Sequence, residues 1–310
     1  MHEIETMFYV RKTPWHGLGT KVAEALTSSE ALTISGLDWT VAQTPIYTES
    51  GHLIKNYKAN VRNTDNAILG VVSDRYTVVQ NKSAFEFTDN LLGAGVKYET
   101  AGSLQGGRRV WLLAKLPEQY IINSEVVEPY LVFSNSHDGS CAINVAMTPV
   151  RIVCMNTLNL ALRQAKRTWS SKHLGNMKSK LHEAEETMGL ANHYMAELNN
   201  EIDILNIIRM PDSKVISYIN DLVPMPDDAT DIQKKNVNQL RDDIITRYYE
   251  APDLRVLDKN AYRFINAVSD FATHSVPIRN TANYQENLFM KTLEGHPVID
   301  RAYAMIKAAA

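Results

Sequence analysis

The pattern of hydrophobic and polar positions divides the chain into a β-rich first half and a helical second half. Segments rich in β-branched and aromatic residues, bounded by turn residues, predict strands at 52–62, 67–79, 96–104, 108–116, 125–137 and 140–150. Between the second and third of these, apolar residues at helical spacing predict a helix over 82–92. This order is typical of an α+β domain with an antiparallel sheet and a ββαβ-type core.

The clearest periodic signal in the chain runs from Leu174 to Leu205. Apolar residues alternate spacings of three and four positions, a heptad pattern that predicts one long helix over 174–209. Two interpretations stay open. The apolar seam packs within its own chain, which its Ala and Met positions favour, or it joins a second copy in a homo-oligomer.

The segments on either side complete the predicted organisation. Pro149 is expected to start a helix that runs to about Lys166, because Pro is common in a first helical turn. The acidic C-terminal part is expected to be all-helical, with helices at 213–222, 231–249, 258–272 and 297–308. Residues 1–50 are interpreted as an irregular N-terminal arm with one short helix at 28–35. The predicted regions are this arm, an α+β core at 51–173 and a helical region at 174–310.

Charge is distributed unevenly along the chain, although its net value is only −3. Residues 1–50 sum to −3, residues 51–180 to +7 and residues 181–310 to −7. The 44 residues from 139 to 182 contain no Asp or Glu at all. A basic block of this length favours a polyanionic partner, whereas a basic helix end alone is also explained by the helix macrodipole.

Aromatic residues accompany basic ones in two places, with Trp169 inside the acid-free block and Trp111 beside Arg108 and Arg109 in the sheet region. Proteins that bind single-stranded nucleic acid combine a positive groove along the phosphates with aromatic faces that stack on bases. We therefore expect phosphate contacts from Arg and Lys, and stacking by Trp111 and Trp169. The candidate nucleic-acid-binding residues are Arg108, Arg109, Trp111, Arg151, Arg163, Lys166, Arg167, Trp169, Lys172, Lys178 and Lys180.

No catalytic or metal-binding constellation is evident in the sequence. The glycine-rich segment 102–108 lacks the Lys-Ser/Thr of a phosphate-binding loop and is interpreted as a hairpin turn. His137 and Asp138 have side chains suited to acid–base or metal chemistry, but adjacent residues of a strand point to opposite faces. Cys141 and Cys154 are too few for a four-thiolate zinc site. We expect no catalytic residue, no cofactor and no metal.

Three motifs resemble those of a known family. They are Pro14-Trp-His-Gly-Leu-Gly19, Ser136-His-Asp-Gly-Ser140 and Thr148-Pro-Val-Arg-Ile-Val-Cys-Met-Asn-Thr157. They resemble motifs of the phage- and plasmid-like proteins that are grouped as a domain of unknown function, over about residues 7–305. The resemblance marks as family positions, without a known role, Trp15, His16, Gly17, Gly19, His137, Asp138 and Asn156.

The predicted element order also resembles the core of phage single-strand annealing proteins, although no residue motif matches. That resemblance implies an oligomer that pairs complementary strands without ATP or metal. The leading hypothesis is a non-enzymatic phage or plasmid DNA-metabolism protein that binds single-stranded DNA. A phage factor that binds a host protein is the alternative, and a metal-dependent nucleic-acid enzyme using His16, His137 and Asp138 is the third. No apolar run approaches the roughly 18 residues of a membrane span, so we expect a bacterial cytoplasmic location and no membrane partner.

Overall fold

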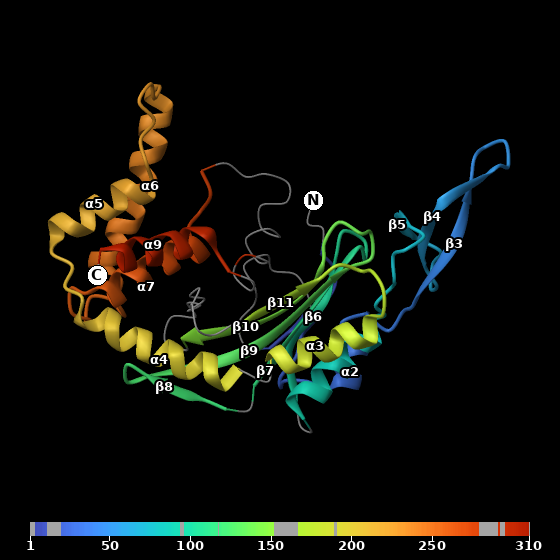
Figure 1. The fold of residues 1–310 in the computed structure, drawn as a ribbon. Helices are drawn as coiled ribbons and strands as arrows, with labels where there is room; N and C mark the ends of the chain where they lie inside the picture. Colours follow the sequence, from blue (N-terminus) through green and yellow to red (C-terminus); the bar gives the residue numbers. More distant parts are fainter. Residues whose placement is uncertain are drawn as a thin grey trace. The chain divides into compact units, whose positions relative to one another are not determined.

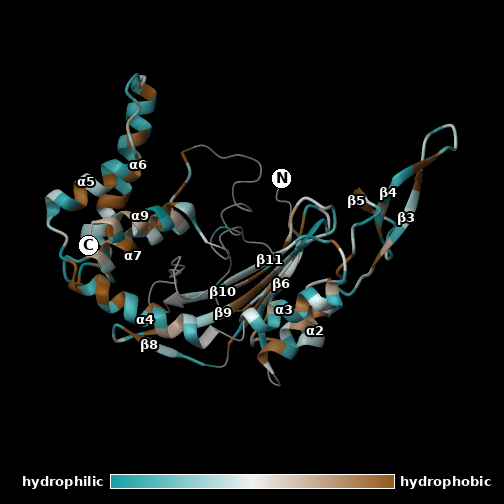
Figure 2. Ribbon diagram, in the orientation of Figure 1, coloured by the Kyte–Doolittle hydropathy of each residue, from teal (hydrophilic) through white to brown (hydrophobic). Residues whose placement is uncertain are grey.

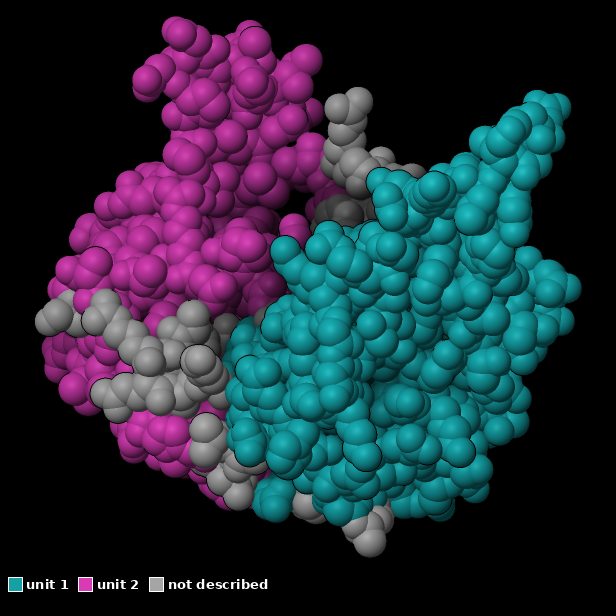
Figure 3. Space-filling model, turned by 45° about the vertical axis from the view of Figure 1, so that its right-hand side comes forward, with its two compact units in different colours: residues 1–118, 129–147, 167–191 teal, residues 119–128, 148–166, 192–310 magenta. Residues whose placement is uncertain are grey.

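The chain folds into two compact units (Figure 3). Unit 1 comprises residues 1–118, 129–147 and 167–191, and unit 2 comprises residues 119–128, 148–166 and 192–310. The computed structural model describes residues 4–10, 20–93, 96–116, 118–151, 167–188, 191–278, 291 and 295–309. Helices and antiparallel strands occur together (Figure 1), which confirms the α+β prediction.

Unit 1 is built on a sheet in the order β11-β10-β9-β7-β6-β1-β2. Its longer strands coincide closely with the predicted segments, because β-branched and aromatic residues fit the pleated, half-buried surface of a sheet. Neighbours β6 and β7, β7 and β9, and β10 and β11 are antiparallel. The strands are β1 (Ile4–Tyr9), β2 (Thr20–Lys21), β6 (Lys97–Leu104), β7 (Arg109–Lys115), β9 (Glu125–Ser136), β10 (Ile143–Arg151) and β11 (Thr168–Ser171).

The N-terminal segment belongs to this sheet, which corrects the prediction of an irregular arm over residues 1–50. Strand β1 pairs antiparallel with β6, and Phe8, opposite Ala101, is fully buried. Its partner strand lies more than 90 residues away along the chain, so the pairing is set by tertiary packing that a short local pattern does not reveal.

Three helices of unit 1 pack together against the main sheet (Figure 1). Helix α1 (Ser28–Ile34) contacts β6, α2 (Asn81–Leu92) contacts β7, and α3 (Met177–Met188) contacts β11. Helix α1 begins with a capping box between Thr27 and Glu30, in which side chains satisfy free N–H groups of the first turn. These helices therefore bury one face of the sheet.

A second, three-stranded sheet extends from the main sheet within unit 1 (Figure 1). From here on we call this sheet the arm, which is a different segment from the irregular arm predicted for residues 1–50. It is an antiparallel meander of β3 (Val41–Tyr47), β4 (Leu53–Arg62) and β5 (Ile68–Ser73). Asn66, in the turn between β4 and β5, has a φ of 60°, a left-handed conformation that Asn tolerates better than most residues. The arm leads directly through residues 74–80 into α2.

The segment around Pro149 differs from its prediction. Pro149 lies inside β10 rather than at the start of a helix, and it follows the last described β10–β11 pair, Ala146 with Thr168. Its missing backbone N–H therefore removes no hydrogen bond to β11. The rest of the predicted helix, residues 152–166, lies outside the described residues.

The heptad-patterned segment is divided between the two units. Helix α3 belongs to unit 1 and α4 (Ala191–Ile207) lies almost wholly in unit 2, with Gly189 and Leu190 outside the described residues. Leu174 at the start of the pattern is exposed. Most of the described seam is buried within the chain, namely Met177, Ala184, Met195, Leu198, Ile202 and Leu205. This burial supports the intramolecular interpretation and leaves little of the seam free for the expected homo-oligomer.

The described residues of unit 2 are mainly helical, and those after residue 191 were predicted to be so. Its strands are the end of β10 and a short hairpin in which β8 (Tyr120–Ile122) pairs with the start of β9. Helix α7 contacts both α6 and α9 and lies at the centre of the unit. The hydrophobic stripe of α7 is almost fully buried, since Tyr262, Phe264 and Ile265 are at most 1% exposed. The remaining helices are α5 (Asp212–Leu222), α6 (Asp231–Glu250), α7 (Ala261–His274) and α9 (Pro297–Ala308).

Among the helices described, none combines the length and apolar character needed to cross a membrane.

Candidate nucleic-acid interface

The strand register brings several loops together at one end of the main sheet of unit 1. Arg109 at the start of β7 pairs with Leu104 at the end of β6 and with Ser136 at the end of β9. Ile143 at the start of β10 pairs with Ser171 at the end of β11. The loops that follow or precede these residues therefore lie at the same ends of the strands, and we call this end of the sheet the loop end.

The turn between β6 and β7 presents two arginines at the loop end. Gln105, Gly106 and Gly107 all have positive φ values, so the chain reverses tightly, as the glycine-rich sequence predicts. Arg108 is exposed directly after this turn. The guanidinium of Arg109 donates to the Ser140 hydroxyl across 3.5 Å, which ties the turn to the loop after β9.

The loop after β11 and the first turn of α3 add three lysines to the same end. Lys172 and Lys178 are exposed. The Lys180 ammonium donates to the backbone carbonyl of Lys172 over 2.9 Å, so the first turn of α3 is held next to the end of β11. This brings together three basic positions that are spread over nine residues of sequence.

Arg75 is a further basic residue at this end, and the sequence patterns do not predict it. It precedes Tyr76, which forms an isolated antiparallel bridge with Leu174 and whose ring stacks on His173 at 4.5 Å. Arg75 is exposed. It lies 97 residues before Lys172 and is adjacent to an acidic residue, Asp74, so no local charge signal marks it.

The Ser136–Ser140 motif lies at the centre of the loop end, and its role is structural. The His137 ring is fully buried and bonds through Nε2 to the Asn81 side chain at 2.9 Å. It also meets the edge of the Trp39 ring at a centroid distance of 5.2 Å. Burial lowers the pKa of His137 to about 3. The ring is therefore neutral at physiological pH, and its role is to connect α2 to the loop after β9.

The backbone of the same motif holds the arm. The Asn60 amide of β4 donates to the His137 carbonyl at 2.6 Å, and the Tyr76 hydroxyl donates to the Ser136 carbonyl. A Cβ at Gly70 would lie 2.4 Å from the Asp138 Cα, so only glycine permits this approach of β5. Asp138 itself accepts the backbone N–H of Ser140 over 2.8 Å, which shapes the turn.

The structure corrects the expectation that the two tryptophans stack on bases. Trp111 is only 2% exposed and Trp169 only 7%. Trp111 lies opposite Gly102 in the β6–β7 ladder, and its ring fills the space that a side chain there would occupy. Trp169 pairs with Val145 inside the β10–β11 ladder. Both indoles are therefore core residues and are not exposed for stacking.

The other candidate residues are not at the loop end, or fall outside the description. Arg167 precedes β11 at its opposite end, and its guanidinium donates to the Met147 carbonyl at 3.2 Å. Arg151 ends β10, and its side chain is not described. Outside the described residues lie Arg163, Lys166, Asn156, Trp15, His16, Gly17 and Gly19.

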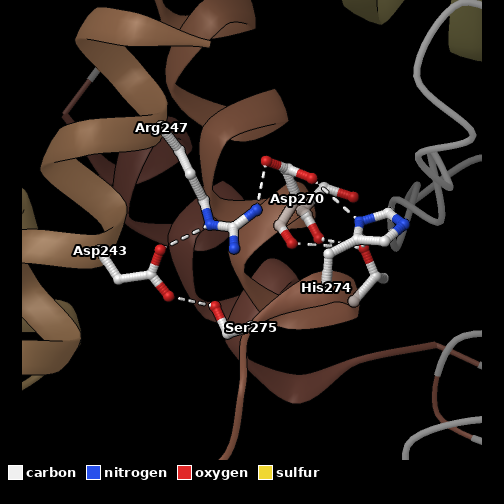
Figure 4. A network of polar contacts seen from close by, with 7 residues as sticks. Asp243, Arg247, Asp270, His274 and Ser275 are labelled. Atoms are coloured by element: carbon white, nitrogen blue, oxygen red, sulfur yellow. Dashed lines mark hydrogen bonds and ion pairs between the residues drawn. The ribbon is translucent and has the colours of Figure 1, made fainter. Parts of the chain in front are cut away.

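A polar network in unit 2 contains Ser, His and Asp, the residue types of a nucleophilic triad (Figure 4). The Ser275 hydroxyl, however, is directed to Asp243, and the His274 Nδ1 bonds to Asp270 at 2.9 Å. Arg247 bridges the two carboxylates and so links α6 to α7. Burial raises the pKa of Asp270, but hydrogen bonds from His274 and Arg247 outweigh it and lower the pKa overall. The network joins two helices and does not pair a nucleophile with a base.

Among the described residues, no three His, Cys, Asp or Glu side chains lie close enough to hold a metal ion. The third hypothesis, a metal-dependent enzyme, requires such a cluster around His137 and Asp138. Its remaining member, His16, lies outside the described residues.

Comparison with known proteins places the chain in a family. A family model described as "Domain of unknown function (DUF932)" matches residues 68–292, well over half of the sequence. The chain belongs to this family. Within the matched region lie all the loops that form the loop end. A search of curated proteins and one of solved structures each returned no match.

Proposed function

We propose that this DUF932 protein binds single-stranded DNA through the loop end of unit 1, as part of phage or plasmid DNA metabolism in a bacterial cytoplasm. One observation carries the proposal. Basic side chains from three separate stretches of sequence come together at this end of the sheet, namely Arg75, Arg108, Arg109, Lys172, Lys178 and Lys180.

The electrostatics of the loop end favour a phosphate backbone. Asp74 and Asp138 are the acidic residues in the same loops, and Asp138 is engaged with the Ser140 backbone. The positive charges therefore outnumber the negative ones locally, although the whole chain is slightly acidic. Binding of phosphates by several Lys and Arg side chains releases counterions, so the affinity is expected to fall steeply with salt.

The burial of both tryptophans limits the mode of binding. Without stacking by Trp111 or Trp169, recognition depends mainly on the phosphate backbone, which is the same for every sequence. We therefore propose a sequence-tolerant interaction, compatible with a role in pairing complementary strands without ATP.

A salt titration of oligonucleotide binding tests this proposal. We expect the double variant Arg108→Ala/Lys172→Ala to weaken binding of a labelled single strand by about tenfold and to reduce the salt slope by about 2, because each lost phosphate contact lowers the slope by about 1. Lys235→Ala, an exposed lysine of α6 in unit 2, is the matched control and is expected to change neither quantity.

The parent chain tests whether the protein binds DNA, and the double variant tests whether the loop end is the interface. If the parent shows no binding at low salt, the proposal is wrong, and the acidic helical part becomes the leading candidate surface for a host protein. If the parent binds and the double variant binds equally well with the same slope, the loop end is not the interface.

A further inference from the structure

The arm of unit 1 has two faces that the strand register defines. Along one face lie Gln43 opposite Asn60, and Asn60 opposite Gly70. Along the other lie Thr44 opposite Ala59, and Ala59 opposite Val71. Since side chains alternate across a strand, the neighbouring positions follow from these pairs.

The first face carries both polar and apolar side chains, and it is the one attached to the rest of unit 1. The Gln43 amide donates to the Tyr76 carbonyl and to the Asn60 side chain, and Asn60 donates to the His137 carbonyl. Arg62 lies over the Trp39 ring at 5.4 Å. The buried side of this sheet is thus held by hydrogen bonds and a cation–π contact. It also buries the apolar side chains of Val41 and Val72, which are 6% and 5% exposed.

The second face, which we call the outer face, is apolar and open. Ile68 is 63% exposed, Val71 is 57% exposed and Tyr57 is 52% exposed. Apolar residues coloured brown are visible on the arm in Figure 2. Where all three strands pair, from Tyr57 to Val61 of β4, the outer face includes no charged side chain, and its residues are Ala42, Thr44, Tyr57, Ala59, Val61, Ile68, Val71 and Ser73.

The outer face is unusual for an antiparallel sheet, which ordinarily turns a polar face to water. A contiguous apolar patch on a sheet marks a surface that a partner covers. We propose that the outer face packs against the same face of a second copy of this chain, forming a homodimer through the arms.

The chemistry of the outer face favours a second copy of the chain over a nucleic acid. A nucleic acid needs positive charge opposite its phosphates, and this face has none. Two identical uncharged faces, by contrast, meet without burying an unpaired charge. Ala42 and Ala59 are small and lie beside the larger Tyr57, Val61 and Val71, which allows two sheets to interdigitate. The inference does not depend on the proposed DNA binding.

Sedimentation of the full chain over a wide concentration range tests the proposal, and we expect the parent to reach twice the chain mass. The variant Ile68→Lys/Val71→Lys is expected to weaken self-association by about a hundredfold or more, because it places unpaired charges in an apolar interface. Both positions are exposed, so the chain is expected to stay folded, which circular dichroism checks. Ile232→Lys, at an equally exposed position of α6, is the matched control and is expected to leave the mass unchanged.

A charge-swap experiment tests self-recognition directly. Ile68→Glu/Val71→Glu is expected to be monomeric alone, and its mixture with the lysine variant to regain the dimer mass. A monomeric parent, or a lysine variant that retains the dimer mass, overturns the proposal. If the parent is monomeric and only the glutamate variant loses oligonucleotide binding, the outer face binds nucleic acid instead.

Discussion

His137 lies at the centre of the loop end and connects three parts of unit 1. Its ring bonds to Asn81 of α2 and touches Trp39, while its carbonyl accepts a hydrogen bond from Asn60 of the arm. Because a charged imidazolium in this buried site would lose its hydration, the folded protein keeps the ring neutral. A residue type that is often catalytic is therefore used in this protein to hold loops in register.

This burial predicts a pH dependence of stability. The pKa of His137 falls from about 6.5 in the unfolded chain to about 3 in the folded one, and burial lowers the pKa of His173 as well. Between these values only the unfolded chain takes up the proton, so stability is lost as the pH falls below 6.5. For His137 alone, the slope is about 1.4 kcal/mol per pH unit.

Urea unfolding between pH 4.5 and 6.5 measures this slope. His137→Gln is expected to lower stability at neutral pH but to flatten the slope relative to the parent. His193→Gln, at an exposed position of α4, serves as the control for loss of a surface histidine. Equal slopes for the parent and His137→Gln contradict the prediction.

At the scale of elements, the attachment of the arm depends on a close approach of β5 to the loop after β9. Gly70→Ala places a Cβ 2.4 Å from the Asp138 Cα, and backbone cannot move aside as a flexible side chain can. We expect this variant to lose about 1–3 kcal/mol of unfolding free energy through overpacking. Ser73→Ala in the same strand is the control, with an expected change below about 0.5 kcal/mol in urea unfolding. An unchanged stability of Gly70→Ala contradicts the described docking of the arm.

The elements that the sequence predicts well are those whose pattern is local. The sequence predicts a helix at 231–249, and α6 spans Asp231–Glu250, with a capping box at Thr230 that a single turn of sequence encodes. Strand β1 is not predicted, because its stability comes from pairing with β6 and not from its own six residues. The prediction of a helix from Pro149 is wrong at its start, since β10 extends through that position to Arg151.

In the candidate site too, some residues are predicted by a local pattern and others are brought in only by the fold. Lys172, Lys178 and Lys180 lie close together in sequence and charge alone predicts them, whereas Arg75 joins them only through the Tyr76–Leu174 bridge. Trp111 is buried although it lies on the face opposite to the one where Phe133 meets α2, and its ring packs against the position of Gly102 on the neighbouring strand. No local pattern along one strand specifies that contact. Charge blocks therefore locate a surface approximately, while the fold decides which side chains reach it.

At the scale of the whole molecule, charge and structure are distributed differently between the two units. The basic loops belong to unit 1, and the helices of unit 2 come from the acidic part of the sequence. A polyanion is attracted to the first and repelled by the second. The two units are thus expected to respond differently when an oligonucleotide is added.

Hydrogen–deuterium exchange of the full chain, with and without a single-stranded oligonucleotide at low salt, measures this difference. We expect slower exchange in residues 73–77, 105–109 and 172–176, because bound phosphates restrict these loops, and no change in α5, α6 and α7. Raising the salt concentration should remove the protection along with the binding, since both depend on released counterions. Protection confined to the helices of unit 2 would contradict the assignment of the loop end, whatever affinity is measured.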